Sequence, residues 1–155
     1  MYLHEVVTHH KSIFSINYYI LYLSLMSIFS RIIRGEIPCH KIAEDENYFA
    51  FLDISPQAEG HTLVVPKREI DYIFDLDPHT LSGLMLFSQK VAKGLQKAIP
   101  CLRIGITVIG LDVPHAHVHL IPINSMKDMR FSETKPKPSQ EELAKIAENI
   151  RKYIV

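Results

Sequence analysis

The sequence contains little cysteine and no excess charge of either sign, and each shortage argues against a class of protein. Its two cysteines, Cys39 and Cys101, form neither a metal-binding pair nor a disulfide framework, which favours a reducing cytoplasm. Lysine plus arginine equals aspartate plus glutamate at 17 each, so the chain lacks the basic footprint that binding to duplex DNA or RNA requires. The remaining composition, 47% hydrophobic and 22% charged over 155 residues, is ordinary for a single globular domain.

Residues 1–25 differ from the rest of the chain, and we expect them to form an extension outside a domain at residues 26–155. No charged residue occurs from Ser12 to Ser30, a length that approaches a membrane span. Its serines, tyrosines and asparagine are nevertheless too polar for a hydrocarbon interior, and no small-residue cleavage site marks a signal peptide. Met26 would make a natural start. An added extension is therefore favoured over a membrane or targeting segment, and no membrane association is expected.

The hydrophobic pattern of the domain predicts five strands and three helices. Strands are predicted at residues 40–43, 48–52, 61–65, 102–109 and 115–121. A short helix is predicted at residues 28–34, and a long one opens at Asp77-Pro78 and ends at Pro100. The last helix begins at a capping box formed by Ser139 and Glu142. Hairpin-length links between the strands predict an α+β domain: a five-stranded antiparallel sheet with a long helix and a C-terminal helix.

The most informative stretch is His115-Ala116-His117-Val118-His119. Three histidines alternate with small apolar residues, and residues two apart share a face of a strand. The pattern therefore places three imidazoles side by side, with the residues between them turned toward a core. The unperturbed pKa of histidine lies near neutrality, so such a row can supply a nucleophile, an acid, a base or metal ligands.

A metal site is one interpretation of this row, because alternating histidines on a strand also bind zinc or copper. Only His61 is available nearby as a fourth ligand, and no carboxylate-rich surround is encoded. We therefore predict no metal and no cofactor.

Four motifs along the chain carry a resemblance to a known family. They are Ile28-Phe29 with Ile32-Ile33 and Gly35-Glu36-Ile37-Pro38, Phe51-Leu52-Asp53-Ile54-Ser55-Pro56, Gly60 to Lys67, and Val113 to Ile121. In this order and spacing, from Ile28 to about Ile123, the chain resembles the histidine triad (HIT) family, in its nucleotide-binding, nucleoside phosphoramidase-like branch. The resemblance implies the five-stranded sheet, a homodimer, and hydrolysis or transfer at the α-phosphate of a nucleoside phosphoramidate or dinucleoside polyphosphate.

The resemblance also assigns roles to residues of this chain. His117 is expected to be the nucleophile, forming a covalent nucleotidyl-histidine that water later cleaves. His115 and His119 are expected to orient it and to donate to the phosphate or leaving group, with His61 beside the triad. The expected nucleotide-binding residues are Asp53 for the ribose hydroxyls, the base-contacting Phe29, Ile32 and Ile54, and Asp112 and Val113. The simpler alternatives are that Asp53 forms a turn and that Phe29, Ile32 and Ile54 are plain core.

The chain also departs from the family pattern. Many bacterial relatives bind zinc through two cysteines near the amino terminus, where this chain has Ser27 and Ser30, and Glu69 or Ile70 replaces an expected histidine. Zinc is therefore not expected. Leu111 and Asp112 stand where the family often has residues that contact phosphate, which leaves a nucleotide-binding regulatory module with vestigial catalysis as an alternative.

Overall fold

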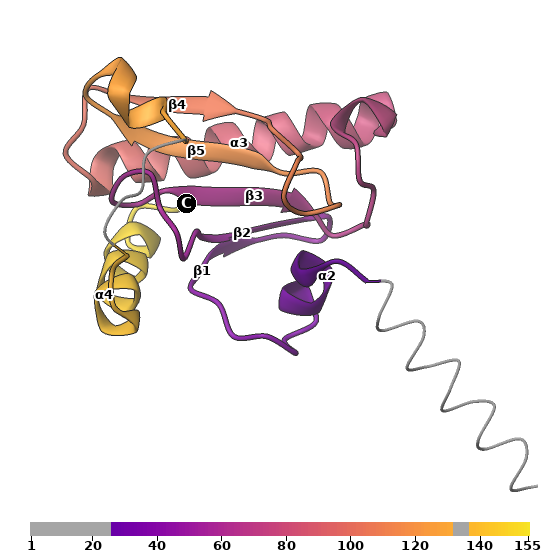
Figure 1. Ribbon diagram of the computed structural model, residues 1–155, viewed down its shortest axis with the longest axis horizontal. Coiled ribbons are helices and arrows are strands. Elements are labelled where there is room, and N and C mark those ends of the chain that lie inside the picture. Colours follow the sequence, from indigo (N-terminus) through magenta and orange to yellow (C-terminus); the bar gives the residue numbers. More distant parts are fainter. Residues whose placement is uncertain (1–25, 132–136) are drawn as a thin grey trace, which may run out of the picture.

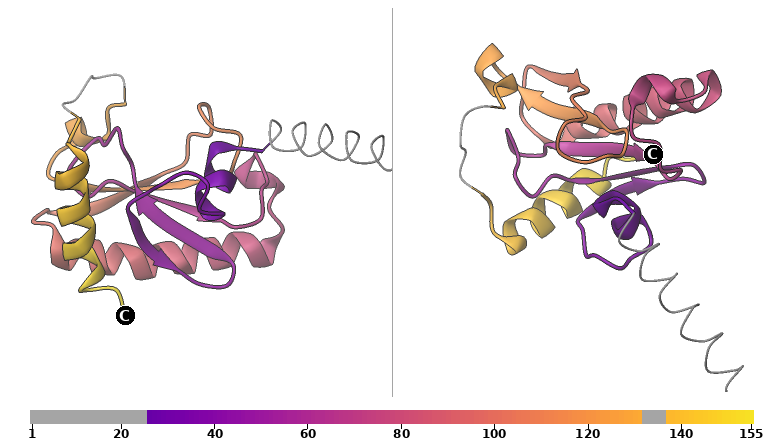
Figure 2. Two further views of the ribbon diagram at one scale, coloured as in Figure 1. Left: turned by 90° about the horizontal axis from the view of Figure 1, so that it is seen from below. Right: turned by 45° about the vertical axis from the view of Figure 1, so that its right-hand side comes forward.

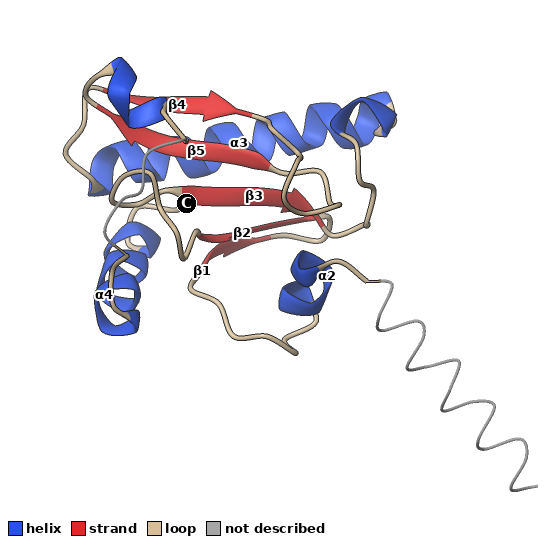
Figure 3. Cartoon of the chain, viewed as in Figure 1, coloured by secondary structure: helices blue, strands red, loops and turns tan. Residues whose placement is uncertain are grey.

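The computed structural model describes residues 26–131 and 137–155, so the expected extension at 1–25 lies outside the described residues. Its core is a five-stranded, fully antiparallel sheet in the order β1-β2-β3-β5-β4 (Figure 1). The predicted α+β class is confirmed. The strands are β1 (Lys41–Glu44), β2 (Tyr48–Leu52), β3 (Thr62–Pro66), β4 (Arg103–Thr107) and β5 (Val118–Ile123). The helices are α2 (Ile28–Ile33), α3 (Pro78–Ala98) and α4 (Gln140–Arg151), with 3-10 turns η1 (Ile73–Asp75) and η2 (Met126–Met129) (Figure 3).

The two faces of the sheet are covered by different helices. Helix α3 crosses one face and α4 packs at its end, whereas the short α2 lies on the opposite face (Figure 2). The α3 face holds the larger core, which includes Val64, Val118 and Leu120. The α2 face holds a smaller cluster of Phe29, Phe49, Phe51, Leu63 and Val65. Since His119 pairs with Leu63 in the β3–β5 ladder, it shares the α2 face.

The ends of α3 and α4 follow the local sequence signals. The Asp77 side chain accepts a hydrogen bond from the amide of Thr80, with Pro78 as the first helical residue, and the helix ends at Ala98, just before Pro100. Ser139 and Glu142 form the predicted capping box at the start of α4. The start of α2 at Ile28 also agrees with the prediction. None of the helices in the described ranges has both the length and the hydrophobicity needed to cross a bilayer.

The strand boundaries near the histidines differ from the prediction. Strand β5 begins at Val118, so only His119 lies within it, and β3 begins at Thr62, one residue after His61. The backbone before β5 is bonded elsewhere, because the amide of His115 donates to the carbonyl of Val113 at 2.8 Å and that of Ala116 to the carbonyl of Ile70 at 2.7 Å. Strand β4 is also shorter than the predicted 102–109. The alternation nevertheless holds, because Ala116 and Val118 lie in the α3-side core.

A close approach between α3 and β2 gives a test of this packing. The Tyr48 hydroxyl donates to the carbonyl of Thr80 at 3.0 Å, and a Cβ atom added at Gly83 would overlap that hydroxyl. We expect Gly83→Ala to lower the free energy of unfolding by about 1–3 kcal/mol, although alanine favours helix by about 1 kcal/mol. Urea denaturation measures the change. Ser82→Ala, at an exposed neighbouring position, is the control and should change stability by less than about 0.5 kcal/mol; a Gly83→Ala protein as stable as the parent would contradict this packing.

Candidate active site

The predicted site residues come from three separate parts of the chain. The segment before β5 carries His115 and His117, the turn between β2 and β3 carries Asp53 and His61, and α2 carries Phe29. In Figure 2 the segment leading into β5 passes beside α2. The rings pack in a row: Phe29 lies edge-on to His117 at 5.1 Å between centroids, and His117 lies 4.8 Å from His119. Tertiary structure therefore gathers these residues on one face of the sheet.

The ring of His117 is fixed by its own backbone. Its Nδ1–H donates to the carbonyl oxygen of His115, two residues earlier, at 2.6 Å. A carbonyl can only accept, so Nδ1 carries a proton, and in the neutral ring Nε2 therefore keeps its lone pair. Within the described residues no hydrogen bond to Nε2 is found. The ring is buried, with 4% of the residue exposed.

A chain of hydrogen bonds fixes the tautomers of His61 and His119. The backbone N–H of Gln57 donates to Nδ1 of His61 at 3.1 Å, so His61 carries its proton on Nε2. That Nε2 lies 3.0 Å from Nδ1 of His119, which must therefore accept. The remaining proton of neutral His119 sits on Nε2, a buried atom with no hydrogen-bond partner among the described residues. An unsatisfied buried donor is costly, and here it lies beside the His117 ring.

Burial also sets the charge of these rings. Burial, reinforced by His61 and His117, lowers the pKa of His119 to about 4, while Asp53 and Asp112 act in the opposite direction. Burial likewise lowers the pKa of His115, against opposing effects of the Pro66 carbonyl and Glu69. Both rings are therefore neutral at pH 7.

His115 differs from the other two histidines because both its nitrogens are bonded within the protein. Nε2–H donates to the carbonyl of Pro66 at 2.8 Å, and Nδ1 lies 2.8 Å from the Ser27 hydroxyl. The residue is fully buried. Its ring therefore has no free donor for a ligand, whereas its carbonyl holds His117.

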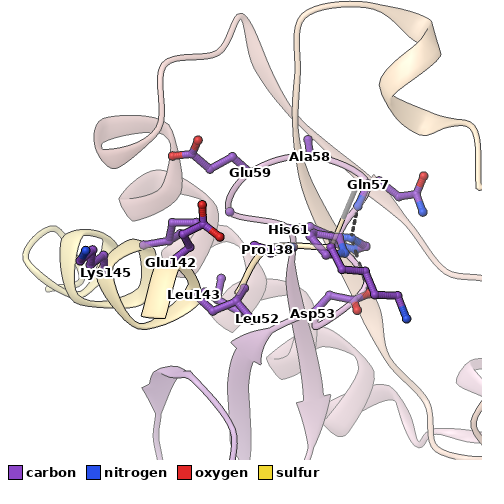
Figure 4. Close-up of a pocket in the computed structure, with 14 residues that line it drawn as sticks. Leu52, Asp53, Gln57, Ala58, Glu59, His61, Pro138, Glu142, Leu143 and Lys145 are labelled. Atoms are coloured by element: carbon purple, nitrogen blue, oxygen red, sulfur yellow. Dashed lines mark hydrogen bonds and ion pairs between the residues drawn. The ribbon is translucent and has the colours of Figure 1, made fainter. Parts of the chain in front are cut away.

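Asp53 serves both its local turn and the site. One carboxylate oxygen accepts from the amide of Ser55 at 2.7 Å, as the turn interpretation predicts. The other lies 3.6 Å from Nδ1 of His61. Asp53 and His61 also form one wall of a cavity of about 620 Å³, which reaches Leu143 and other residues of α4 (Figure 4).

The remaining candidates divide by exposure. Ile32 and Val113 are partly buried and pack against the cluster that contains Phe29. Ile54 is 62% exposed, so it does not belong to the core. Asp112 is exposed, but it is close enough to His119 to affect the pKa of that ring.

Sequence reasoning missed Phe131. Its ring stands edge-on to His119 at 5.2 Å and to His61 at 6.2 Å between centroids, from the far side of the row to Phe29. No local pattern singles out an aromatic residue in the irregular segment after η2. The Gln57 amide was also missed, because backbone donors carry no residue signature.

One group of residues has ligand-type atoms close together. Such atoms of Asp53, His61 and His119 lie within 4.8 Å of one another. Hydrogen bonds already engage both His61 nitrogens and Nδ1 of His119, and a cation would have to displace them. Those hydrogen bonds favour a proton-handling arrangement over a metal site.

The fold and the site define an antiparallel α+β domain with a buried row of histidines at the start of one strand. A family model described as the HIT domain matches residues 34–126, more than half of the chain, and this chain belongs to the HIT family. Adenosine 5′-monophosphoramidase HNT1 of Saccharomyces cerevisiae is 36% identical over 101 residues, which are 64% of each chain. A HIT-like protein from Bartonella henselae superposes with a TM-score of 0.71 at 36% identity, covering 82% of this chain and 95% of its own.

A zinc-bound histidine triad family protein from Mycobacterium smegmatis is also similar, with a TM-score of 0.70 at 25% identity, covering 84% of this chain and 94% of its own. In the present chain, the hydroxyls of Ser27 and Ser30 lie 2.8 and 3.4 Å from Nδ1 of His115, and the Ser30 hydroxyl donates to Glu69. Neutral hydroxyls are poor zinc ligands compared with thiolates. These residues do not fit a zinc ion.

The depressed pKa of His119 predicts a pH-dependent stability. In the unfolded chain the histidine pKa returns to about 6.5, so below that pH the unfolded state binds the proton more readily. Stability is therefore fully present above pH 6.5 and decreases as the pH falls toward 4. From pH 7 to pH 5 we expect His119 to account for a loss of about 1–2 kcal/mol.

Urea unfolding at several pH values measures this loss. His119→Gln should flatten the pH dependence over that interval, whereas His79→Gln, at an exposed position on α3, should keep the parental slope. Parallel slopes for His119→Gln and the parent would show that His119 is not the cause.

Proposed function

We propose that this protein cleaves a nucleotide at its α-phosphate through a covalent bond between phosphorus and Nε2 of His117. The observation that carries the proposal is the 2.6 Å hydrogen bond from Nδ1–H of His117 to the carbonyl of His115. A neutral imidazole held this way directs one lone pair outward, which suits attack on phosphorus near neutral pH. The chain's membership of the HIT family supports the same reaction class.

In the first step, the lone pair of His117 attacks the α-phosphorus and the bond to the leaving group breaks. Nε2–H of His119 faces this point as a hydrogen-bond donor to phosphate oxygen. The negative phosphate raises the pKa of His119, so the ring takes up a proton when substrate binds. The charged ring carries a proton on each nitrogen, and its Nε2 proton passes to the departing nitrogen or oxygen, which leaves Nε2 unprotonated.

In the second step, water attacks the nucleotidyl-histidine. Neutral His119 now accepts a proton from the water, whose oxygen forms the new bond to phosphorus while the bond to His117 breaks. Nucleoside monophosphate leaves and His117 is restored. In the resting protein, His61 sets the tautomer of His119 by donating to its Nδ1.

We assign binding of the nucleoside part of the substrate to Asp53 and to residues of α2. A carboxylate accepts two hydrogen bonds from vicinal ribose hydroxyls, and Asp53 keeps part of its side chain exposed beside His61. Phe29 and Ile32 would contact the base. Because a similar protein is an adenosine 5′-monophosphoramidase, we propose a nucleoside phosphoramidate as the first substrate class to test.

The proposal predicts a nucleotide trapped on His117. With a slow adenosine 5′-phosphoramidate, a rapid denaturing quench at alkaline pH should preserve adenylate on this residue, which mass spectrometry of peptides locates. His117→Ala should lower turnover by at least about 1,000-fold, because the nucleophile itself is removed. Binding of adenosine monophosphate should change little.

The control is His79→Ala, which alters an exposed histidine and should keep full turnover. Label on another residue, or turnover that survives in His117→Ala, would overturn the assignment. Nucleotide binding without turnover in the parent would favour the regulatory module instead.

We also propose a homodimer formed through β4 and α3. Strand β4 is an edge of the sheet, and Met85 and Leu86 on α3 are 42% and 66% exposed. Ile106 on β4 is 48% exposed and lies beside them along a shallow hollow. Exposed apolar surface next to a bare strand edge favours pairing with a second copy.

The dimer predicts a mass of two chains in light scattering at micromolar concentration. Ile106→Asp should raise the dimer dissociation constant at least about tenfold, because it places a charge inside the apolar contact. Ile28→Glu, on the opposite face of the sheet, should leave the mass unchanged. A parent protein that elutes as a monomer would rule the dimer out.

For the location of the protein we propose a reducing cytoplasm. Cys39 and Cys101 are both free thiols. Burial raises the pKa of each thiol, which makes both less reactive and leaves them without an evident redox role.

A further inference from the structure

Four polar residues converge behind the histidine row, and we call them the serine–glutamate cluster: Ser27, Ser30, Glu69 and His115. Ser27 and Ser30 are 4% and 5% exposed, and His115 is fully buried. Glu69 stands at the surface, but its carboxylate reaches inward. It accepts from the Ser27 amide at 3.1 Å and forms a short hydrogen bond with the Ser30 hydroxyl. The cluster joins α2, the segment after β3 and the segment before β5.

The protons in the cluster can be assigned one by one. Because a carboxylate only accepts, the Ser30 hydroxyl gives its single proton to Glu69. Its oxygen lies 3.4 Å from Nδ1 of His115, so without Glu69 this hydroxyl could compete for that nitrogen. The Ser27 hydroxyl is the closer donor to Nδ1, at 2.8 Å, and also accepts from the Ser30 amide as the cap of α2. Hydrogen bonds from Ser30 and Ser27 outweigh burial and lower the pKa of Glu69, so its carboxylate is ionised at neutral pH.

The segment after β3 also fixes the peptide group that binds the nucleophile. The carbonyl of Ile70, next to Glu69, accepts from the amide of Ala116 at 2.7 Å. That amide and the carbonyl of His115 belong to one planar peptide group. The peptide is therefore fixed at one end by Ile70 and at the other by Nδ1–H of His117, while the cluster fixes the His115 ring beside it.

We propose that Glu69 is a positioning residue for His117, acting through Ser30, Ser27 and the His115 ring to hold the His115 carbonyl in place. The cluster thus joins α2 to the histidine row through hydrogen bonds. The same residues are unsuited to bind a metal. Its effect on rate rests on the proposed function, whereas its effect on the His117 ring does not.

Kinetics of Glu69 variants test the effect on rate. Glu69→Ala removes the acceptor of the Ser27 amide and frees the Ser30 hydroxyl to compete for Nδ1 of His115, and we expect kcat for adenosine 5′-phosphoramidate to fall about 10- to 100-fold. KM should change less than about threefold, because the cluster makes no contact with the nucleotide. Glu69→Gln keeps an accepting oxygen and should stay within about threefold of the parent kcat. Asp71→Ala, at an exposed carboxylate two residues away, should match the parent.

Ring ¹⁵N spectra of His117 test the positioning without any substrate. The parent and Asp71→Ala should have Nδ1 protonated and Nε2 unprotonated, whereas Glu69→Ala should give averaged signals of both tautomers. If Glu69→Ala folds poorly, Ser30→Ala removes one of the two bonds to Glu69 with a smaller change and should give the same averaging to a smaller degree. Parental spectra in both variants, or a Glu69→Gln protein as impaired as Glu69→Ala, would overturn the proposal. If the parent turns over no nucleotide, the proposed function fails while the spectra still decide the role of Glu69.

Discussion

The site depends on one hydrogen bond, from Nδ1–H of His117 to the carbonyl of His115. It selects one tautomer of His117, in which Nε2 is the nitrogen of that ring with a free lone pair. The bond joins residues two apart, so an extended backbone brings donor and acceptor together. Its geometry depends on the position of the His115 peptide. That peptide is held by the hydrogen bond from the amide of Ala116 to the carbonyl of Ile70 and by the buried His115 ring.

Because the surrounding polar network is buried, its hydrogen bonds determine which ring nitrogens carry protons. Inside the protein, hydrogen bonds are stronger than in water and unpaired polar atoms are costly. The network satisfies both His115 nitrogens and assigns the protons of His61 and His119. Nε2 of His119 remains as a buried donor without a partner among the described residues. In the proposed reaction, this donor is the group that binds a phosphate oxygen beside the His117 lone pair.

The two faces of the sheet have different roles: one carries most of the apolar core and the other carries the candidate site. Its α3 face carries the large apolar core, and the segment before β5 contributes Ala116 to that core. The opposite face carries the histidine row, the aromatic cluster and α2. Because successive residues point to opposite faces, one short stretch serves both purposes. The short α2 is attached both by Phe29 in the aromatic cluster and by the bonds of Ser27 and Ser30 to Glu69 and His115.

The sequence by itself determined the fold class, the helix caps at Asp77 and Ser139, and the common face of the three histidines. These follow from local signals: side-chain hydrogen bonds within one turn and the two-residue period of extended backbone. Only the tertiary structure decided that His115 turns its ring into the protein, that the Gln57 amide sets the tautomers of His61 and His119, and that Phe131 and Glu69 join the site. Those contacts pair residues far apart in the chain or use backbone atoms, and neither leaves a pattern in the order of side chains.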